Sequence, residues 1–196
     1  MKKYEKTGYL HHDFKIFHLT DHEMSTYDFH YHDFHKLLFF LSGNVTYCIE
    51  GKSYQLTPGD LVLVRAGEVH RPVIHDTTPY ERMIIYVSPD FAAASSDKMV
   101  SLNQCFLPDV AMPSNVLHLS GMKERRLLDI MMELVHSFSE DGFANEIYQN
   151  TLFLEFMIHL NRAALSGTLQ YEDSFQANEK ILSVLTYMNE HLTEDI

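Results

Sequence analysis

The stretch His30–Arg71, HYHDFHKLLFFLSGNVTYCIEGKSYQLTPGDLVLVRAGEVHR, decides the fold of this chain. Its short apolar segments are separated by Ser42-Gly43-Asn44, Glu50-Gly51-Lys52 and Pro58-Gly59-Asp60, which are typical turn residues. Short β segments at about ten-residue spacing indicate an antiparallel sandwich or barrel. We therefore predict strands near residues 36–42, 44–50, 53–56, 60–65, 70–74 and 81–87.

The first of these strands is apolar on both of its faces. Leu38 and Phe40 share a face with Lys36, whereas Leu37 and Phe39 point the other way. A strand with two apolar faces must be buried on both sides, so another element is expected to cover the outside of the sheet. The alternating residues from Phe14 to His18 also predict a strand, at a sheet edge.

The second half of the chain supplies the covering element. After a bridge that we interpret as loop-rich, from about 88 to 118, the apolar period changes from 2 to 3.6. We predict one helix from Ser120 to about Asp141-Gly142 and a second from Asn145 to Leu165, stopped by Gly167, which together form an αα-hairpin. A third helix is predicted over about 179–192.

Apolar residues occupy more than one stripe of this helical hairpin, which favours packing on the sheet and against a second copy of the chain. A hairpin wholly buried within one chain is the alternative. The residues predicted to form the dimer contact are Leu127, Met131, Leu134, Phe138, Leu154 and Met157.

Charge and hydropathy exclude several classes of function. A formal net charge of −12 argues against binding of nucleic acid by this chain alone, because that affinity comes from lysine and arginine on phosphates. The sequence contains no run of about 18 apolar residues, and its N-terminus lacks the apolar segment of a signal peptide. We therefore expect a cytoplasmic protein that has no membrane partner.

Two histidines spaced i, i+2 begin the opening stretch. On a strand, His30, His32 and Lys36 lie on one face, and we expect His70 to join them in a pocket. The three histidines are candidate ligands for zinc, nickel or iron, and His35 would be a fourth ligand if a β-bulge turned it inward. An ammonium beside a divalent cation is repelled by it, so Lys36 argues against a strong metal site. We expect no cofactor beyond a weakly or adventitiously bound divalent metal.

Without a metal, the same side chains form a small-molecule site. The imidazoles and the ammonium provide hydrogen-bonding groups, and the predicted walls are Phe40, Tyr47 and Tyr86. Such a lining suits a polyol or a carboxylate.

These residues resemble the N-terminal, effector-binding and dimerisation half of AraC/XylS-type transcription regulators, which has a cupin fold. His30, His32, Lys36 and Gly43 are similar to the front motif of cupins, and the segment PGDLVLVRAGEVH is similar to the back motif. Two positions depart from the pattern: Lys36 stands where metal-binding cupins have glutamate, and Arg65 where proline is usual. The segment at 80–91 is similar to the strand that ends these sensor domains.

The resemblance implies an α+β fold, in which an antiparallel β-barrel or jelly roll of the cupin type is followed by the helical hairpin and a C-terminal helix. It divides the chain into a barrel with an N-terminal arm (1–118), a dimerisation hairpin (119–168), and a linker with the lead-in helix of a DNA-binding half (169–196).

It also implies a function: a homodimeric sensor that binds a small metabolite and relays the signal to a helix-turn-helix half beyond Ile196, through which alone it would contact DNA. The expected protein is not an enzyme. The alternative is a small metal-dependent cupin enzyme, an oxygenase or an isomerase.

Overall fold

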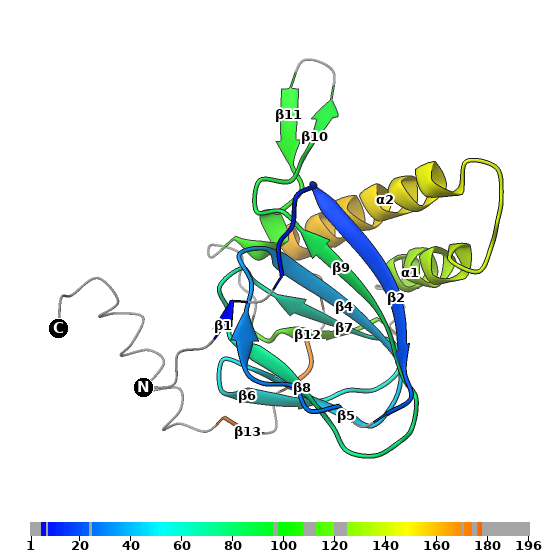
Figure 1. Cartoon of the computed structure of the whole chain (residues 1–196). Helices are drawn as coiled ribbons and strands as arrows, with labels where there is room; N and C mark the ends of the chain where they lie inside the picture. The colour runs from blue at the N-terminus through cyan, green and yellow to red at the C-terminus, as the bar shows by residue number, and fades with distance from the viewer. Residues whose placement is uncertain are drawn as a thin grey trace, which may run out of the picture.

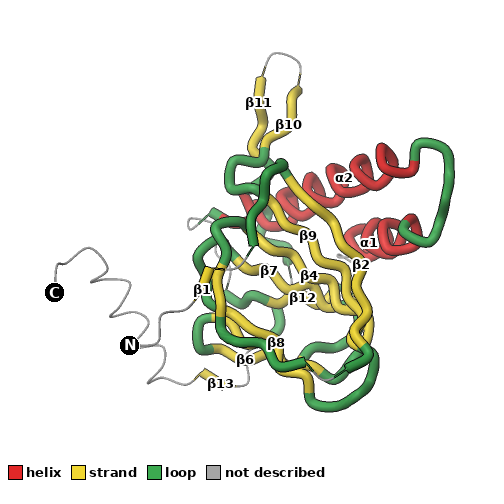
Figure 2. Tube along the Cα trace, viewed as in Figure 1, coloured by secondary structure: helices red, strands yellow, loops and turns green. Residues whose placement is uncertain are grey.

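Two β-sheets face each other in the computed structural model, which describes residues 5–6, 8–23, 25–95, 98–107, 113–119, 125–169, 171–173 and 176–177. Figures 1 and 2 show the helices on the outer side of one of these sheets. The six-stranded sheet has the order β1 (Glu5–Lys6), β3 (His30–Tyr31), β8 (His70–Ile74), β5 (Val45–Ile49), β6 (Lys52–Gln55) and β13 (Gln176–Ala177). The five-stranded sheet has the order β12 (Val116–His118), β7 (Asp60–Val64), β4 (His35–Ser42), β9 (Tyr80–Val87) and β2 (Phe14–Asp21).

The predicted strands are confirmed. All six strands expected from residue 36 onward are present, with limits that differ from the prediction by no more than about two residues. The segment beginning at Phe14 is strand β2, and it lies at the edge of the five-stranded sheet, as expected. Within the two large sheets the pairings are antiparallel except that of β1 with β3.

Strand β4 is buried on both faces, which also agrees with the sequence. Leu37 and Phe39 belong to a hydrophobic cluster that includes side chains of both helices. Leu38 and Phe40 belong to a second cluster, which lies between the two sheets. The prediction that another element covers the outside of the sheet is therefore confirmed.

That element is the helical hairpin of α1 (Arg125–Ser137) and α2 (Asn145–Leu165), which packs on the outer face of the five-stranded sheet (Figure 1). Gly167 ends α2 as expected: its φ is +64°, and the N–H of Thr168 donates to the carbonyl of Ala163 at 3.1 Å. Ser120 and the predicted helix at 179–192 lie outside the described residues. No helix in the described part of the chain has the length and hydropathy needed to cross a membrane.

The turn after β4 needs glycine. Gly43 has a φ of +127°, and a Cβ added there would lie 3.3 Å from the Cα of Tyr80. This close approach joins the end of β4 to the start of β9, so the Ser42-Gly43-Asn44 break seen in the sequence has a steric cause.

The bridge from 88 to 118 contains more regular structure than predicted. It forms the hairpin of β10 (Ala92–Ser95) and β11 (Lys98–Ser101), which projects from the body of the molecule (Figure 1), a 3₁₀ turn at Gln104–Phe106, and strand β12. Strand β12 has only three residues, too few to show a period, and it forms because its backbone pairs with β7.

Candidate ligand-binding site

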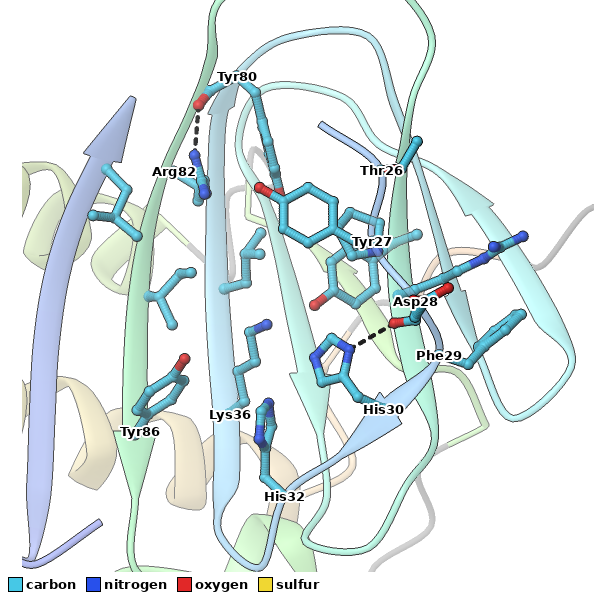
Figure 3. A pocket seen from close by; sticks show the side chains of 16 residues that line it. Thr26, Tyr27, Asp28, Phe29, His30, His32, Lys36, Tyr80, Arg82 and Tyr86 are labelled. Atoms are coloured by element: carbon cyan, nitrogen blue, oxygen red, sulfur yellow. Dashed lines mark hydrogen bonds between the residues drawn. The ribbon is translucent and has the colours of Figure 1, made fainter. Parts of the chain in front are cut away.

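A cavity of ≈ 1080 Å³ lies between the two sheets. Side chains from both sheets and from the segment before β3 line it (Figure 3). The lining residues are Leu19, Thr26, Tyr27, Asp28, Phe29, His30, His32, Lys36, Leu38, Tyr47, Arg71, Pro72, Tyr80, Arg82, Ile84 and Tyr86.

His30, His32 and His70 meet at one end of this cavity. His30 on β3 pairs in register with His70 on β8, and His32 follows β3 directly. The ring centroids lie 4.6 to 5.0 Å apart, and one nitrogen from each ring lies within 4.8 Å of the other two. The structure thus brings together the three histidines that the sequence placed in one pocket, with His70 joining as predicted from a second strand, although His32 lies just beyond β3 and not on it.

Hydrogen bonds fix the tautomers of two of these rings. The Nδ1–H of His30 donates to the carbonyl of Asp28 at 2.8 Å, and that of His70 donates to the carbonyl of Glu68 at 3.0 Å. Because a carbonyl only accepts, each Nδ1 has the proton and each Nε2 has a lone pair. The Nε2 of His70 is buried and has no hydrogen-bond partner among the described residues. Burial, and then the charge of Lys36, lower the pKa of His70 to about 2, so the ring is neutral.

Lys36 projects from β4 into the middle of the cavity, between Tyr86 and His30 (Figure 3). Only 6% of the residue is exposed, and it makes no ion pair with any described carboxylate. Its Nζ lies 5.6 Å from the ring centroid of Tyr47, which reaches in from the facing sheet. Burial, with a smaller effect of Arg82, lowers the pKa of Lys36 to about 7.

Arg82 on β9 is a second buried cation in the lining, and sequence analysis missed it. Its guanidinium donates to the carbonyl of Tyr80 at 2.9 Å and to the carboxylate of Asp21 at 2.7 Å. Tyr27 donates to the same carboxylate at 3.0 Å. The available signal was the spacing of this arginine in β9, two residues from Tyr80 and four from Tyr86, which places it on the same face as both tyrosines.

Five of the seven predicted ligand-binding residues line the cavity: His30, His32, Lys36, Tyr47 and Tyr86. His70 lies behind them in the histidine cluster. The prediction for Phe40 is wrong: it is fully buried in the core and packs against Tyr80, which forms the cavity wall in its place.

His35 cannot be a fourth metal ligand in this arrangement. It lies on the opposite face of β4, stacked on Phe106 at a centroid distance of 4.1 Å. Its Nδ1 accepts a hydrogen bond from the N–H of Ala66 at 3.0 Å. The irregularity of β4 falls between Phe40 and Ser42, so no bulge turns His35 inward.

The predicted dimer residues divide into two groups. Leu127, Met131, Leu134 and Met157 are at most 3% exposed and pack in the core cluster of their own chain, so they cannot contact a partner. Phe138 is exposed and Leu154 is partly buried. The 3.6-residue period identified the apolar positions without showing which of them the chain's own sheet would cover.

Comparison with solved structures found only partial overlaps. The vicilin of Corylus avellana (hazelnut) overlaps 39% of this chain and 22% of its own, at 16% identity and a TM-score of 0.36. The DMSP lyase DddQ of Ruegeria pomeroyi DSS-3 overlaps 39% of each chain, at 23% identity and a TM-score of 0.36. An RmlC-like cupin protein of Methanocaldococcus jannaschii overlaps 38% of this chain and 70% of its own, at 16% identity and a TM-score of 0.35. At these scores the overlaps support no argument about function.

The comparison of families is decisive. No curated protein matches the chain. The family model described as the AraC-like ligand binding domain matches residues 12–157, which include the cavity residues, α1 and the first part of α2. The fold is α+β and cupin-like, with antiparallel sheets followed by two helices, and the chain belongs to the AraC-like ligand binding domain family.

Proposed function

We propose that this chain is the effector-sensing and dimerisation domain of a DNA-binding transcription regulator. Its cavity binds a small polar metabolite, a sugar or a carboxylate, and the signal passes to a helix-turn-helix half. The observation that supports this most is the cavity itself: it has room for a metabolite, and it presents the buried Lys36 and a cluster of imidazoles to its contents. We place the protein in the cytoplasm and assign its DNA contacts to that half alone.

The N-terminal arm supports a relay from the cavity. Residues 14–21 are a strand of the sheet, so the arm comprises the residues before them. Strand β1 pairs with β3, next to His30, and Lys6 forms a 2.6 Å ion pair with Asp33. A Cβ added to Gly8 would lie 3.4 Å from the ring of Phe34, which stacks on His32. The arm therefore contacts the histidine end of the cavity.

The segment after α2 supports the relay in the same way. Tyr171 bridges to Leu117 on β12, and β13 pairs with β6 on the other sheet. The segment after α2 thus contacts a strand of each of the two sheets that enclose the cavity. A ligand can change such contacts only if the chain has two conformations that differ in them and the ligand binds one conformation more tightly than the other.

The effector proposal is tested by calorimetry with a panel of sugars and carboxylates on the wild-type chain and on Lys36→Ala and His70→Ala. We expect at least one member of the panel to bind and both variants to weaken it, because each substitution removes a polar group from the cavity or its base. Binding that is unchanged in both variants would contradict the assignment of the cavity.

The dimer proposal now depends on a different stripe of α2. Ile147, Ile158 and Leu165 are exposed, and with Leu154 they follow steps of seven, four and seven residues, which places them on one side of the helix. We expect Ile158→Glu to shift the chain to monomer in light scattering at tens of micromolar. Met132→Glu, at an exposed position of α1, is the control. A wild-type chain that is monomeric at that concentration would contradict the proposal.

A metal site is the second candidate, because three histidines converge and the Nε2 of His70 has no partner. His30, His32 and His70 would hold a divalent ion, which would supply Lewis-acid chemistry to an oxygen ligand. This is also the basis of the enzyme alternative, an oxygenase or isomerase, which the family match disfavours.

The nearby ammonium of Lys36 opposes metal binding, so we expect Lys36→Met to bind Ni²⁺ or Zn²⁺ more tightly than the wild type in calorimetric titrations. Equal metal affinities of the wild type and Lys36→Met would show that Lys36 does not oppose metal binding.

A further inference from the structure

We infer that the ligand of the cavity is a carboxylate with a largely apolar body rather than a neutral sugar. This inference rests on the proposed effector-binding function and specifies the class of effector. It follows from the balance of hydrogen-bond donors and acceptors in the lining, from the partners that Lys36 lacks, and from the apolar surface that remains.

The lining is rich in positive charge and poor in acceptors. Among its 16 described residues, Lys36, Arg71 and Arg82 are cations, Asp28 is the only carboxylate, and glutamate, asparagine and glutamine are absent. The chain as a whole has a net charge of −12, so the lining of the cavity is positive in a chain that is otherwise negative. A positive, partly enclosed site attracts anions.

A neutral sugar fits this lining poorly. Each sugar hydroxyl donates as well as accepts, and a buried donor without an acceptor costs about 1–3 kcal/mol. Apart from hydroxyl groups and the exposed Asp28, the acceptors are the imidazole lone pairs, and these lie at one end of the cavity. Lys36 and Arg82 themselves only donate, and the carboxylate of Asp21 beside Arg82 already accepts from Arg82 and Tyr27. A carboxylate brings acceptors and no donors, and so matches that region.

Lys36 and Tyr47 form the anchor for the carboxylate. They approach each other from facing sheets, with the ammonium 5.6 Å from the centre of the tyrosine ring. Lys36 is 94% buried and has no carboxylate partner in the described part of the chain, where the buried hydroxyl of Tyr47 likewise has no hydrogen-bond partner. One carboxylate oxygen on Nζ and the other on the tyrosine hydroxyl would satisfy both groups with charge-assisted hydrogen bonds.

Arg82 has a supporting role. Its charge is already balanced by Asp21, and its guanidinium is held by the carbonyl of Tyr80, so it cannot act as the main anchor. It is close enough to Lys36 to lower the pKa of that ammonium, and the two cations together keep the region positive. Of these two cations, Lys36 is therefore the one whose charge the ligand would balance.

The rest of the cavity is suited to an apolar body. Leu38, Pro72 and Ile84 also line the cavity; Pro72 pairs in register with Tyr47, and Ile84 with Leu38. The rings of Tyr27, Tyr80 and Tyr86 form further walls (Figure 3). Apolar ligand surface is stabilised by leaving water for such walls, whereas a ring of hydroxyls loses hydrogen bonds there.

The test compares matched probes by calorimetry at pH 7 in EDTA: phenylacetate against its neutral isostere phenylacetamide, and phenylacetate against glucuronate and glucose. We expect phenylacetate to bind about tenfold or more tightly than the amide, and more tightly than either sugar. Lys36→Met and Lys36→Gln should abolish the preference for phenylacetate over the amide. Lys15→Met, at an exposed lysine of β2 that does not line the cavity, should retain it.

Equal binding of phenylacetate and phenylacetamide, or a preference that survives both Lys36 variants, would overturn the carboxylate inference. Tighter binding of glucose would also overturn it, and would leave the effector function standing. Failure of all four probes at millimolar concentration would overturn the inference about ligand class, whereas the effector function is judged by the metabolite panel and the His70→Ala variant.

Discussion

The two faces of β4 are equally buried and chemically opposite. Toward the helices, Leu37 and Phe39 enter an apolar cluster that contains Phe153 and Phe156 of α2. Toward the other sheet, Leu38 and Phe40 share their face with the buried Lys36. The outer face thus stabilises the domain, whereas the inner face leaves a charge without a partner. Stability and binding are therefore separable on the two sides of one strand.

Truncation on the outer side should give the largest effect. Phe153→Ala removes a fully buried ring that packs between α2 and the sheet. We expect the free energy of unfolding to fall by about 3–5 kcal/mol, measured by urea denaturation. The control Phe143→Ala removes an exposed ring from the same hairpin and should cost less than about 0.5 kcal/mol. Similar losses in both variants would contradict the assignment of the outer core.

Acid should destabilise the domain because two histidines, one on each side of β4, are buried in their neutral form. Burial lowers the pKa of His35, on the outer face, to about 4 and that of His70, on the inner side, to about 2. At a pH between the folded pKa of each histidine and its unfolded pKa of about 6.5, the unfolded chain binds more protons than the folded chain. The free energy of unfolding is therefore greatest above pH 6.5 and falls as the pH is lowered. Lowering the pH from 6.5 to 5 should reduce the free energy of unfolding by on the order of 2 kcal/mol for each ring.

Denaturation in EDTA at several pH values measures this loss. Burial raises the pKa of Glu68 to about 6, which opposes the loss, because this carboxyl is protonated in the folded state before it is in the unfolded chain. His35→Gln keeps an acceptor for the N–H of Ala66 and should flatten the pH profile. An unchanged profile in that variant would exclude His35 as a source of the acid sensitivity.

Replacing Lys36 should separate stability from binding. Lys36→Met removes a buried charge that has no described ion-pair partner, so we expect the free energy of unfolding at pH 7 to rise by about 1–3 kcal/mol. The same variant should lose affinity for carboxylates. A variant that is both less stable and unchanged in binding would show that Lys36 has a structural role, like the residues on the outer face of β4.

Asp21→Asn should give the smallest effect. It weakens the 2.7 Å ion pair with Arg82, and because Asp21 is about one-third exposed, the stability loss should stay near 1 kcal/mol or below. The change frees positive charge beside the cavity, so a carboxylate should bind a few-fold more tightly in calorimetry. Weaker binding would mean that Asp21 positions Arg82 for the ligand rather than neutralising it.

Local patterns determined how much of this molecule could be predicted. The alternation in β4 and β9, the turn glycines and the period of α2 fix each element by itself, so the edge strand at Phe14, the six strands between residues 36 and 87 and the helical hairpin were predicted correctly. The short strands outside these ranges were not predicted. The side of a helix that is covered depends on the sheet beneath it, which is why four dimer residues were placed wrongly. His35, Phe40 and Arg82 were misjudged or missed for a similar reason: the packing of Phe106 and Tyr80 decides where those side chains lie.

The pairing of β1 with β3 is a weak contact. Among the described residues two pairs join these strands, and the ion pair between Lys6 and Asp33 that reinforces them is exposed to solvent. Opening this contact breaks neither hydrophobic cluster, so it is a local fluctuation with a low free-energy cost. Amide hydrogens of residues 5–6 should therefore exchange far faster than those of β4. The arm would then detach from β3, beside His30, without unfolding of the rest of the domain.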